Sequence, residues 1–155
     1  MTPPLAAETL THRLILPRDA NHYGSLFAGE LLSLALEAAY ATAYRAIGIS
    51  ANLVLKRVLD LRCFEPVKVG QVIEIRGREV HRARAMVVIG LVATPLPGRS
   101  LPWMDGLMQF AQVDGAGRPV AIEVAEPIAP PLATPPWGAL HDRSIRLLGV
   151  RGGRG

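Results

Sequence analysis

The sequence of 155 residues contains one cysteine, Cys63, which excludes a disulfide within the chain and a zinc site built from several cysteines. Aromatic residues make up only 5% of the chain and charged residues only 19%, whereas 50% are hydrophobic. A chain with so little charge and so many apolar residues folds around a core. Its length is that of one domain. No nucleophile motif surrounds Cys63, which we interpret as a small core residue.

Neither a targeting segment nor a membrane-spanning segment is expected. The first ten residues include Pro3, Pro4 and Glu8, and they contain no basic stretch followed by a long apolar run. The best apolar stretch, residues 31–44, is interrupted by Glu37 and is shorter than the roughly 20 residues that a membrane-spanning helix needs. We therefore expect a soluble cytoplasmic protein with no membrane partner.

The net charge of +4 lies mainly at the C-terminal end of the chain. Residues 128–155 hold four arginines and one aspartate, a net of +3, which leaves +1 for the other residues. A basic tail is not the basic groove that binds nucleic acid, so no nucleic-acid partner is expected. Five of the thirteen residues from 126 to 138 are prolines, which is typical of a stiff linker. We predict a domain over residues 1–127, then a proline-rich linker and basic tail over residues 128–155 whose removal leaves the fold intact.

The order of hydrophobic patterns predicts an α+β fold. Residues 28–47 carry apolar side chains around most of a helix, and Gly48 is placed to end it, so a long buried helix is expected. A short helix is expected near residues 140–148. Strands are predicted at 11–17, 51–60, 61–67, 71–80, 85–93, 107–113 and 119–122, with a turn at 114–117. One early helix followed by antiparallel strands favours a sheet wrapped around that helix.

Three segments in this order resemble the hotdog-fold acyl-CoA thioesterases, in which such a sheet surrounds a central helix. They are residues 16–29 (LPRDANHYGSLFAG), 64–70 (FEPVKVG) and 110–119 (FAQVDGAGRP). The resemblance covers roughly residues 12–125. It implies hydrolysis of an acyl-CoA thioester to a free acid and CoA, with no metal and no cofactor beyond the CoA of the substrate. It also implies a homodimer, often assembled further into a hexamer of three dimers.

The resemblance places the thioester carbonyl at the N-terminus of the central helix, near Ala28 and Gly29. Free backbone N–H groups and the helix dipole stabilise a developing oxyanion there. Asn21 matches the family's loop asparagine, which holds the carbonyl or a water, while an Asx turn is the alternative role for this residue. Leu36 stands where the family has an acidic residue, and the nearest carboxylate, Glu37, lies about 100° further around the helix.

Glu37 is therefore either the displaced general base, acting opposite Asn21 of a second subunit, or a solvated residue. Arg82, Arg84 and Lys68 are candidates for binding the phosphates of CoA, because guanidinium and ammonium groups suit phosphate oxygens.

Two other functions remain open for this sequence. A protein that binds acyl-CoA or another acyl ligand without hydrolysing it is compatible with Leu36 at the position of the acid. An enoyl-CoA hydratase-like enzyme would use Asp19 and His22 as an acid–base pair. Their spacing differs from the hydratase pattern, so capping or hydrogen bonding within the loop is the favoured role for these two residues.

Overall fold

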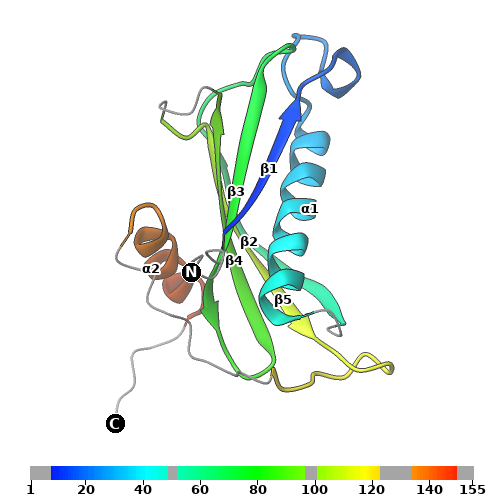
Figure 1. Ribbon diagram of the computed structural model, residues 1–155, viewed down its shortest axis with the longest axis vertical. Helices are drawn as coiled ribbons and strands as arrows, with labels where there is room; N and C mark the ends of the chain where they lie inside the picture. The colour runs from blue at the N-terminus through cyan, green and yellow to red at the C-terminus, as the bar shows by residue number, and fades with distance from the viewer. Residues whose placement is uncertain (1–7, 49–51, 97–100, 123–133, 150–155) are drawn as a thin grey trace, which may run out of the picture.

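The computed structural model describes residues 8–48, 52–96, 101–122 and 134–149. Its core is a five-stranded antiparallel sheet in the order β1-β3-β4-β5-β2. Helices α1 (Ala28–Ile47) and α2 (Trp137–Leu148) lie on opposite faces of this sheet, as Figure 1 shows. The predicted α+β class is confirmed. The strands are β1 (Glu8–Leu14), β2 (Leu53–Cys63), β3 (Val72–Arg82), β4 (Met86–Pro95) and β5 (Met104–Gln112), and a short 3-10 helix, η1, spans Pro17–Asp19.

Alternating residues of the strands form two separate apolar clusters, one on each face of the sheet. The inner cluster lies under α1 and contains, among others, Ile73, Ile75, Ile89, Leu91 and Met108. The outer cluster lies under α2 and comprises Val80, Val88, Val92, Leu107, Trp137 and Leu140. Because β4 contributes to both clusters, eight of its ten residues are buried.

Helix α1 begins and ends where the sequence predicts, with the N–H of Gly48 donating to the carbonyl of Tyr44 at 2.9 Å. Its buried face packs so closely on the sheet at Gly77 that a Cβ at that position would collide with the Thr42 hydroxyl. Outside this buried face, Leu32 and Tyr40 are 37% and 43% exposed, and the Tyr40 ring also lies 6.0 Å from the ring of Phe110 on the sheet. The expected long buried helix is therefore present, with seven of its residues buried, and the sheet of one chain covers one side of it.

The strand predictions need two corrections. The separate strands expected at 51–60 and 61–67 are one strand, β2, whose pairing with β5 shifts register twice, between Leu55 and Arg57 and between Val58 and Asp60. The turn at 114–117 is present, with the Gly117 N–H donating to the carbonyl of Asp114 at 3.0 Å. The strand expected after it is reduced to a single bridge between Val113 and Pro119.

Helix α2 begins three residues before its predicted start and packs on the outer face of the sheet. Trp137 is 1% exposed, and its indole N–H donates to the Glu8 carboxylate at 2.6 Å. Leu140 packs over Gly90, where an added Cβ would lie 3.2 Å from its Cδ1. Residues 137–148 are therefore part of the folded core. The domain boundary at residue 127 stays a prediction, and residues 123–133, which include much of the predicted linker, lie outside the described residues. Because α2 packs on the sheet, we expect removal of residues 128–155 to destabilise the fold.

Candidate functional site

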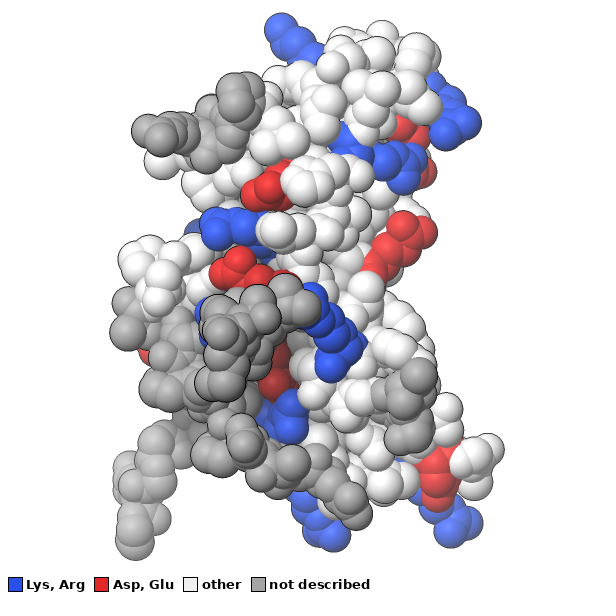
Figure 2. All heavy atoms as spheres, viewed as in Figure 1, with Lys and Arg blue, Asp and Glu red and all other residues white. Residues whose placement is uncertain are grey.

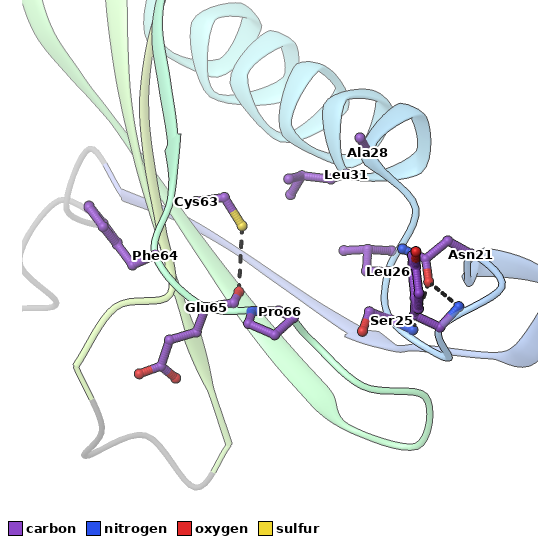
Figure 3. A pocket seen from close by; sticks show the side chains of 10 residues that line it. Asn21, Ser25, Leu26, Ala28, Leu31, Cys63, Phe64, Glu65 and Pro66 are labelled. Atoms are coloured by element: carbon purple, nitrogen blue, oxygen red, sulfur yellow. Dashed lines mark hydrogen bonds between the residues drawn. The ribbon is translucent and has the colours of Figure 1, made fainter.

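A cleft of about 520 Å³ opens at the N-terminal end of α1. This volume lies within the range of roughly 300–1,000 Å³ that is typical of small-molecule sites. In Figure 3, Asn21, Leu26 and Ala28 lie on one side of the cleft, and residues 63–66 lie across from them. We call residues 63–66 the cleft wall. The cleft brings Asn21 and Ala28 together, as the sequence predicts, and its lining is mostly apolar.

The N-terminus of α1 has free backbone donors at this cleft. Phe27 is its N-cap residue and makes no side-chain capping hydrogen bond, and the first intrahelical bond is donated by Leu31 to Phe27. The N–H groups of residues 28–30 precede that bond and have no carbonyl in the helix to bind. The ring of Phe27 lies against Gly29, where a Cβ would be only 2.5 Å from the ring. Glycine at 29 therefore makes room for Phe27 beside these donors.

Asn21 holds the turn of the loop that precedes α1. Its Oδ1 accepts hydrogen bonds from the backbone N–H groups of Tyr23, at 2.9 Å, and Ser25, at 3.2 Å. This is the Asx-type turn that the sequence allowed as an alternative role. Within the described residues, the side-chain amide nitrogen of Asn21 has no hydrogen-bond partner. The same residue therefore supports the loop with its oxygen and leaves an N–H donor for a ligand in the cleft.

Asp19 and His22 have separate partners and form no acid–base pair. The Asp19 carboxylate is 3% exposed, accepts from the backbone N–H of Leu16 at 2.9 Å and pairs with Arg13 at 3.2 Å. Arg13 also reaches Glu30 in the first turn of α1, at 3.4 Å. His22 is exposed, and its ring lies 3.9 Å from that of Tyr23. The predicted role of Asp19 in loop hydrogen bonding is confirmed.

Leu36 and Glu37 point in different directions from a regular helix. Leu36 is partly buried and packs on the inner cluster. Glu37 is exposed and forms no ion pair with another described residue. It does not line the cleft of its own chain. A role for Glu37 in this site therefore requires a second subunit and stays a prediction.

The three basic side chains proposed to bind CoA, those of Lys68, Arg82 and Arg84, do not form one cluster within a single chain. Lys68 is exposed, and its backbone forms an isolated antiparallel β-bridge with Ser25, which lines the cleft. Arg82 pairs with the 4%-exposed Glu79 at 2.6 Å and donates to the carbonyl of Ala46 near the far end of α1. Its guanidinium is therefore occupied by the fold. Arg84 is exposed, two residues further along the chain from Arg82. Contact of these cations with CoA stays a prediction.

Cys63 belongs to the cleft wall, so the interpretation of this residue as part of the core is wrong. The side chain is exposed, and its thiol donates to the carbonyl of Glu65 at 3.5 Å. Partial burial raises the pKa of the Cys63 thiol more than the bond to Glu65 lowers it. The thiol is therefore mostly protonated near neutral pH and is a poor nucleophile. The carboxylate of Glu65 points away from Asn21 in Figure 3.

Charged side chains of both signs are interspersed on the face shown in Figure 2, with uncharged surface between them. None of the helices in the described parts of the chain has the length and hydrophobicity needed to cross a membrane. The described residues also contain no cluster of three or more His, Cys, Asp or Glu side chains suited to a metal ion. The absence of a metal or cofactor stays a prediction.

No protein-family model and no curated protein sequence matches this chain. Solved structures do match it. The acyl-CoA hydrolase of Staphylococcus aureus, in complex with butyryl-CoA, CoA and CoA disulfide, is similar with a TM-score of 0.77 over 94% of this chain and 84% of its own, at 16% identity. A hexameric acyl-CoA thioesterase in its apo form is similar with a TM-score of 0.77 over 93% of this chain and 90% of its own, at 22% identity. The hexameric thioesterase of Yersinia pestis is similar with a TM-score of 0.68 over 79% of this chain and 100% of its own, at 23% identity.

At such low identities the similarity establishes the fold. The chain has the hotdog fold, with α1 as the central helix and the five strands in the order given above. The solved structures named here that share this fold are acyl-CoA hydrolases and thioesterases. The fold expected from the sequence is confirmed.

Proposed function

We propose that this chain hydrolyses an acyl-CoA thioester to a free acid and CoA. The observation that carries the proposal is the opening of the uncapped N-terminus of α1 into an apolar cleft beside the free amide of Asn21. Backbone donors at a helix N-terminus stabilise the oxyanion that forms when water attacks a carbonyl. An apolar cleft accommodates the acyl group and excludes bulk water. The structural similarity to acyl-CoA hydrolases supports the same reaction class.

In the proposed reaction, the N–H groups of Ala28 and Gly29 bind the thioester oxygen. Asn21 Nδ2 donates to the substrate or to the attacking water. The water oxygen bonds to the carbonyl carbon, the carbon–sulfur bond breaks, and the thiol of CoA leaves with a proton. Glu37 of a second subunit is the proposed base that accepts a proton of the water and then passes it to the leaving sulfur of CoA. Lys68, which is exposed beside the cleft, is the proposed contact for a CoA phosphate, with Arg84 as a further candidate.

Strand β2 is the proposed dimer interface that brings Glu37 to the partner's cleft. It forms one edge of the sheet, and Val54, Leu55 and Val58 on it are each 41–42% exposed. A long edge strand with exposed apolar residues pairs readily with another strand. Two-fold pairing of β2 with its copy would join the two sheets and place the uncovered faces of the α1 helices near each other. Assembly into hexamers, as in two of the similar structures, is a further step of the same proposal.

A charge at the middle of β2 is expected to break this dimer. Val58 is the central residue of the strand, so antiparallel two-fold pairing places its two copies close together. Val58→Lys should weaken dimerisation at least about 100-fold, because like charges in an interface cost several kcal/mol. Sedimentation velocity over a concentration series measures the change. The matched control is Leu10→Lys, at a 57%-exposed position on the opposite edge strand, which should stay dimeric. The reverse pattern would assign the interface to β1.

The test of the proposed reaction is a panel of acyl-CoA esters of increasing chain length, incubated with the purified protein. Release of free CoA from one class of ester, in proportion to the enzyme concentration, supports hydrolysis. Absence of release from every ester contradicts it.

A second function, acyl-CoA binding without hydrolysis, is favoured by one observation. Leu36 packs on the core where the resemblance expects an acid, and Glu65, the one carboxylate among the described residues that line the cleft, points away from Asn21 in Figure 3. Calorimetric binding of an acyl-CoA without its turnover would select this function. The hydratase alternative loses its basis, because Asp19 is held by Arg13 and Leu16 and is not paired with His22.

A further inference from the structure

The geometry points to Arg143 of helix α2 as a positioning residue for the cleft wall, although it lies on the other face of the sheet. Its contacts lead through Asp105 and Arg62 to Phe64, which lines the cleft. The consequence for acyl-CoA binding rests on the proposed function. The positioning of the wall itself does not depend on that function.

The first step is the attachment of α2 to the sheet. The Arg143 guanidinium donates to Asp105 on β5, at 2.9 Å from Nη2 and 3.4 Å from Nη1. Its Nε also lies 3.1 Å from a carboxylate oxygen of Asp60 on β2, at ion-pair distance but without hydrogen-bond alignment. Arg143 and Asp105 both have side chains that are only 15% exposed. Partly buried charge-assisted bonds of this kind are stronger and more rigid than bonds between exposed groups.

The second step is the sharing of Asp105 between two arginines. Arg62, its register partner on β2, donates from Nε at 3.0 Å and from Nη2 at 2.8 Å. Burial alone would raise the pKa of the Asp105 carboxyl, but the hydrogen bonds from Arg62 and Arg143 together lower it. Asp105 therefore stays ionised and holds both guanidinium groups over the ordinary pH range.

The third step is the contact between Arg62 and the cleft wall. The Arg62 guanidinium carbon lies 5.1 Å from the centre of the Phe64 ring, within the range of a cation–π interaction. The backbone N–H of Phe64 donates to the carbonyl of Trp103 at 2.7 Å, which fixes the start of the wall. Without Arg143, Asp105 would be balanced by the more exposed Arg62 alone. Residues 63–66 would then lose part of the support that keeps them facing Asn21 across the cleft.

The test compares Arg143→Ala with Arg57→Ala. Arg57 is the matched control because it also connects β2 to α2, through a 3.3 Å hydrogen bond to the carbonyl of Leu147, and has no part in the contacts to the wall. Hydrogen exchange at the Phe64 amide is the first measurement. It should become about tenfold faster in Arg143→Ala, the effect of losing one charge-assisted bond, and should stay unchanged in Arg57→Ala. Asp105→Asn should behave like Arg143→Ala.

The second measurement is steady-state kinetics on an acyl-CoA that the wild type hydrolyses. Arg143→Ala should raise KM about tenfold with little change in kcat, because it disturbs substrate binding and no reacting group. Unchanged exchange at Phe64 in folded Arg143→Ala overturns the inference, as does an equal increase in Arg57→Ala. If Arg143→Ala does not fold, Arg143→Gln is tested in the same way. If the wild type hydrolyses no ester, the proposed function fails, while the exchange measurement still decides the role of Arg143.

Discussion

Replacing Trp137 by alanine is expected to lower the free energy of unfolding by about 3–5 kcal/mol, the usual cost of removing a buried aromatic side chain. The indole is 1% exposed and packs in the outer cluster, with Arg76 located 5.9 Å from the centre of its ring. The substitution also removes the donor to the Glu8 carboxylate. Urea denaturation measures the loss, and the fluorescence of Trp103, the other tryptophan of the chain, reports unfolding in both proteins.

The control for this substitution is Leu147→Ala on the same helix. Leu147 is 41% exposed, so its truncation should cost less than about 1 kcal/mol. If Trp137→Ala also costs less than about 1 kcal/mol, α2 does not stabilise the domain. The sequence-based description of residues 128–155 as a dispensable tail would then be right.

Asn21→Asp is expected to reduce acyl-CoA hydrolysis at least about tenfold, the scale of one positioned polar group. Aspartate keeps an oxygen that accepts from the N–H groups of Tyr23 and Ser25, so the turn before α1 is retained. It lacks the amide donor that we assign to the substrate or to the water. The melting temperature should therefore stay close to that of the wild type while kcat falls. Wild-type turnover in this variant would remove Asn21 from the reaction and leave it as a turn residue.

Mixing inactive variants tests whether Asn21 and Glu37 meet in one cleft across two subunits. If Glu37→Gln is also inactive, random exchange of subunits with Asn21→Asp makes half of the dimers mixed. Each mixed dimer has one intact cleft and one doubly altered cleft, so about a quarter of wild-type activity should return. No recovery after proven exchange would exclude a shared site. Full activity of Glu37→Gln alone would show that Glu37 is a solvated residue.

The sequence predicted the parts of the fold whose determinants are local. Helix α1 has a continuous apolar pattern and a glycine at its C-cap, and its predicted bounds match the structure. Strand β2 was divided in two because its continuity depends on pairing with β5 across two bulges, which the sequence of β2 alone does not contain. The docking of α2 was missed for a similar reason. Gly90, inside an apolar strand, was the available signal, since such a glycine often marks the close approach of another element.

The sequence predicted residues of the candidate site only where they lie together in one continuous segment. Asn21 and Ala28 lie in a continuous motif, so the sequence indicated both, and both line the cleft. Cys63 was interpreted as a core residue because composition does not reveal that β2 ends at an open cleft. The sequence did not indicate that Arg82 forms an ion pair with Glu79, three residues earlier, and contact of Arg82 with a CoA phosphate stays a prediction. Arg143 reaches the wall only through tertiary contacts, and no local pattern indicates it.

The strand order also determines which parts of this chain come together first during folding. Strands β3, β4 and β5 are consecutive in the sequence and adjacent in the sheet, so they meet by short connections. Pairing of β1 with β3 and of β2 with β5 joins residues about 40 to 70 positions apart, from Cys63 with Met104 to Glu8 with Arg78. Closing such long loops costs entropy before the contacts form. We therefore expect truncations in β4, such as Ile89→Val, to slow folding, and truncations in the edge strands to accelerate unfolding instead.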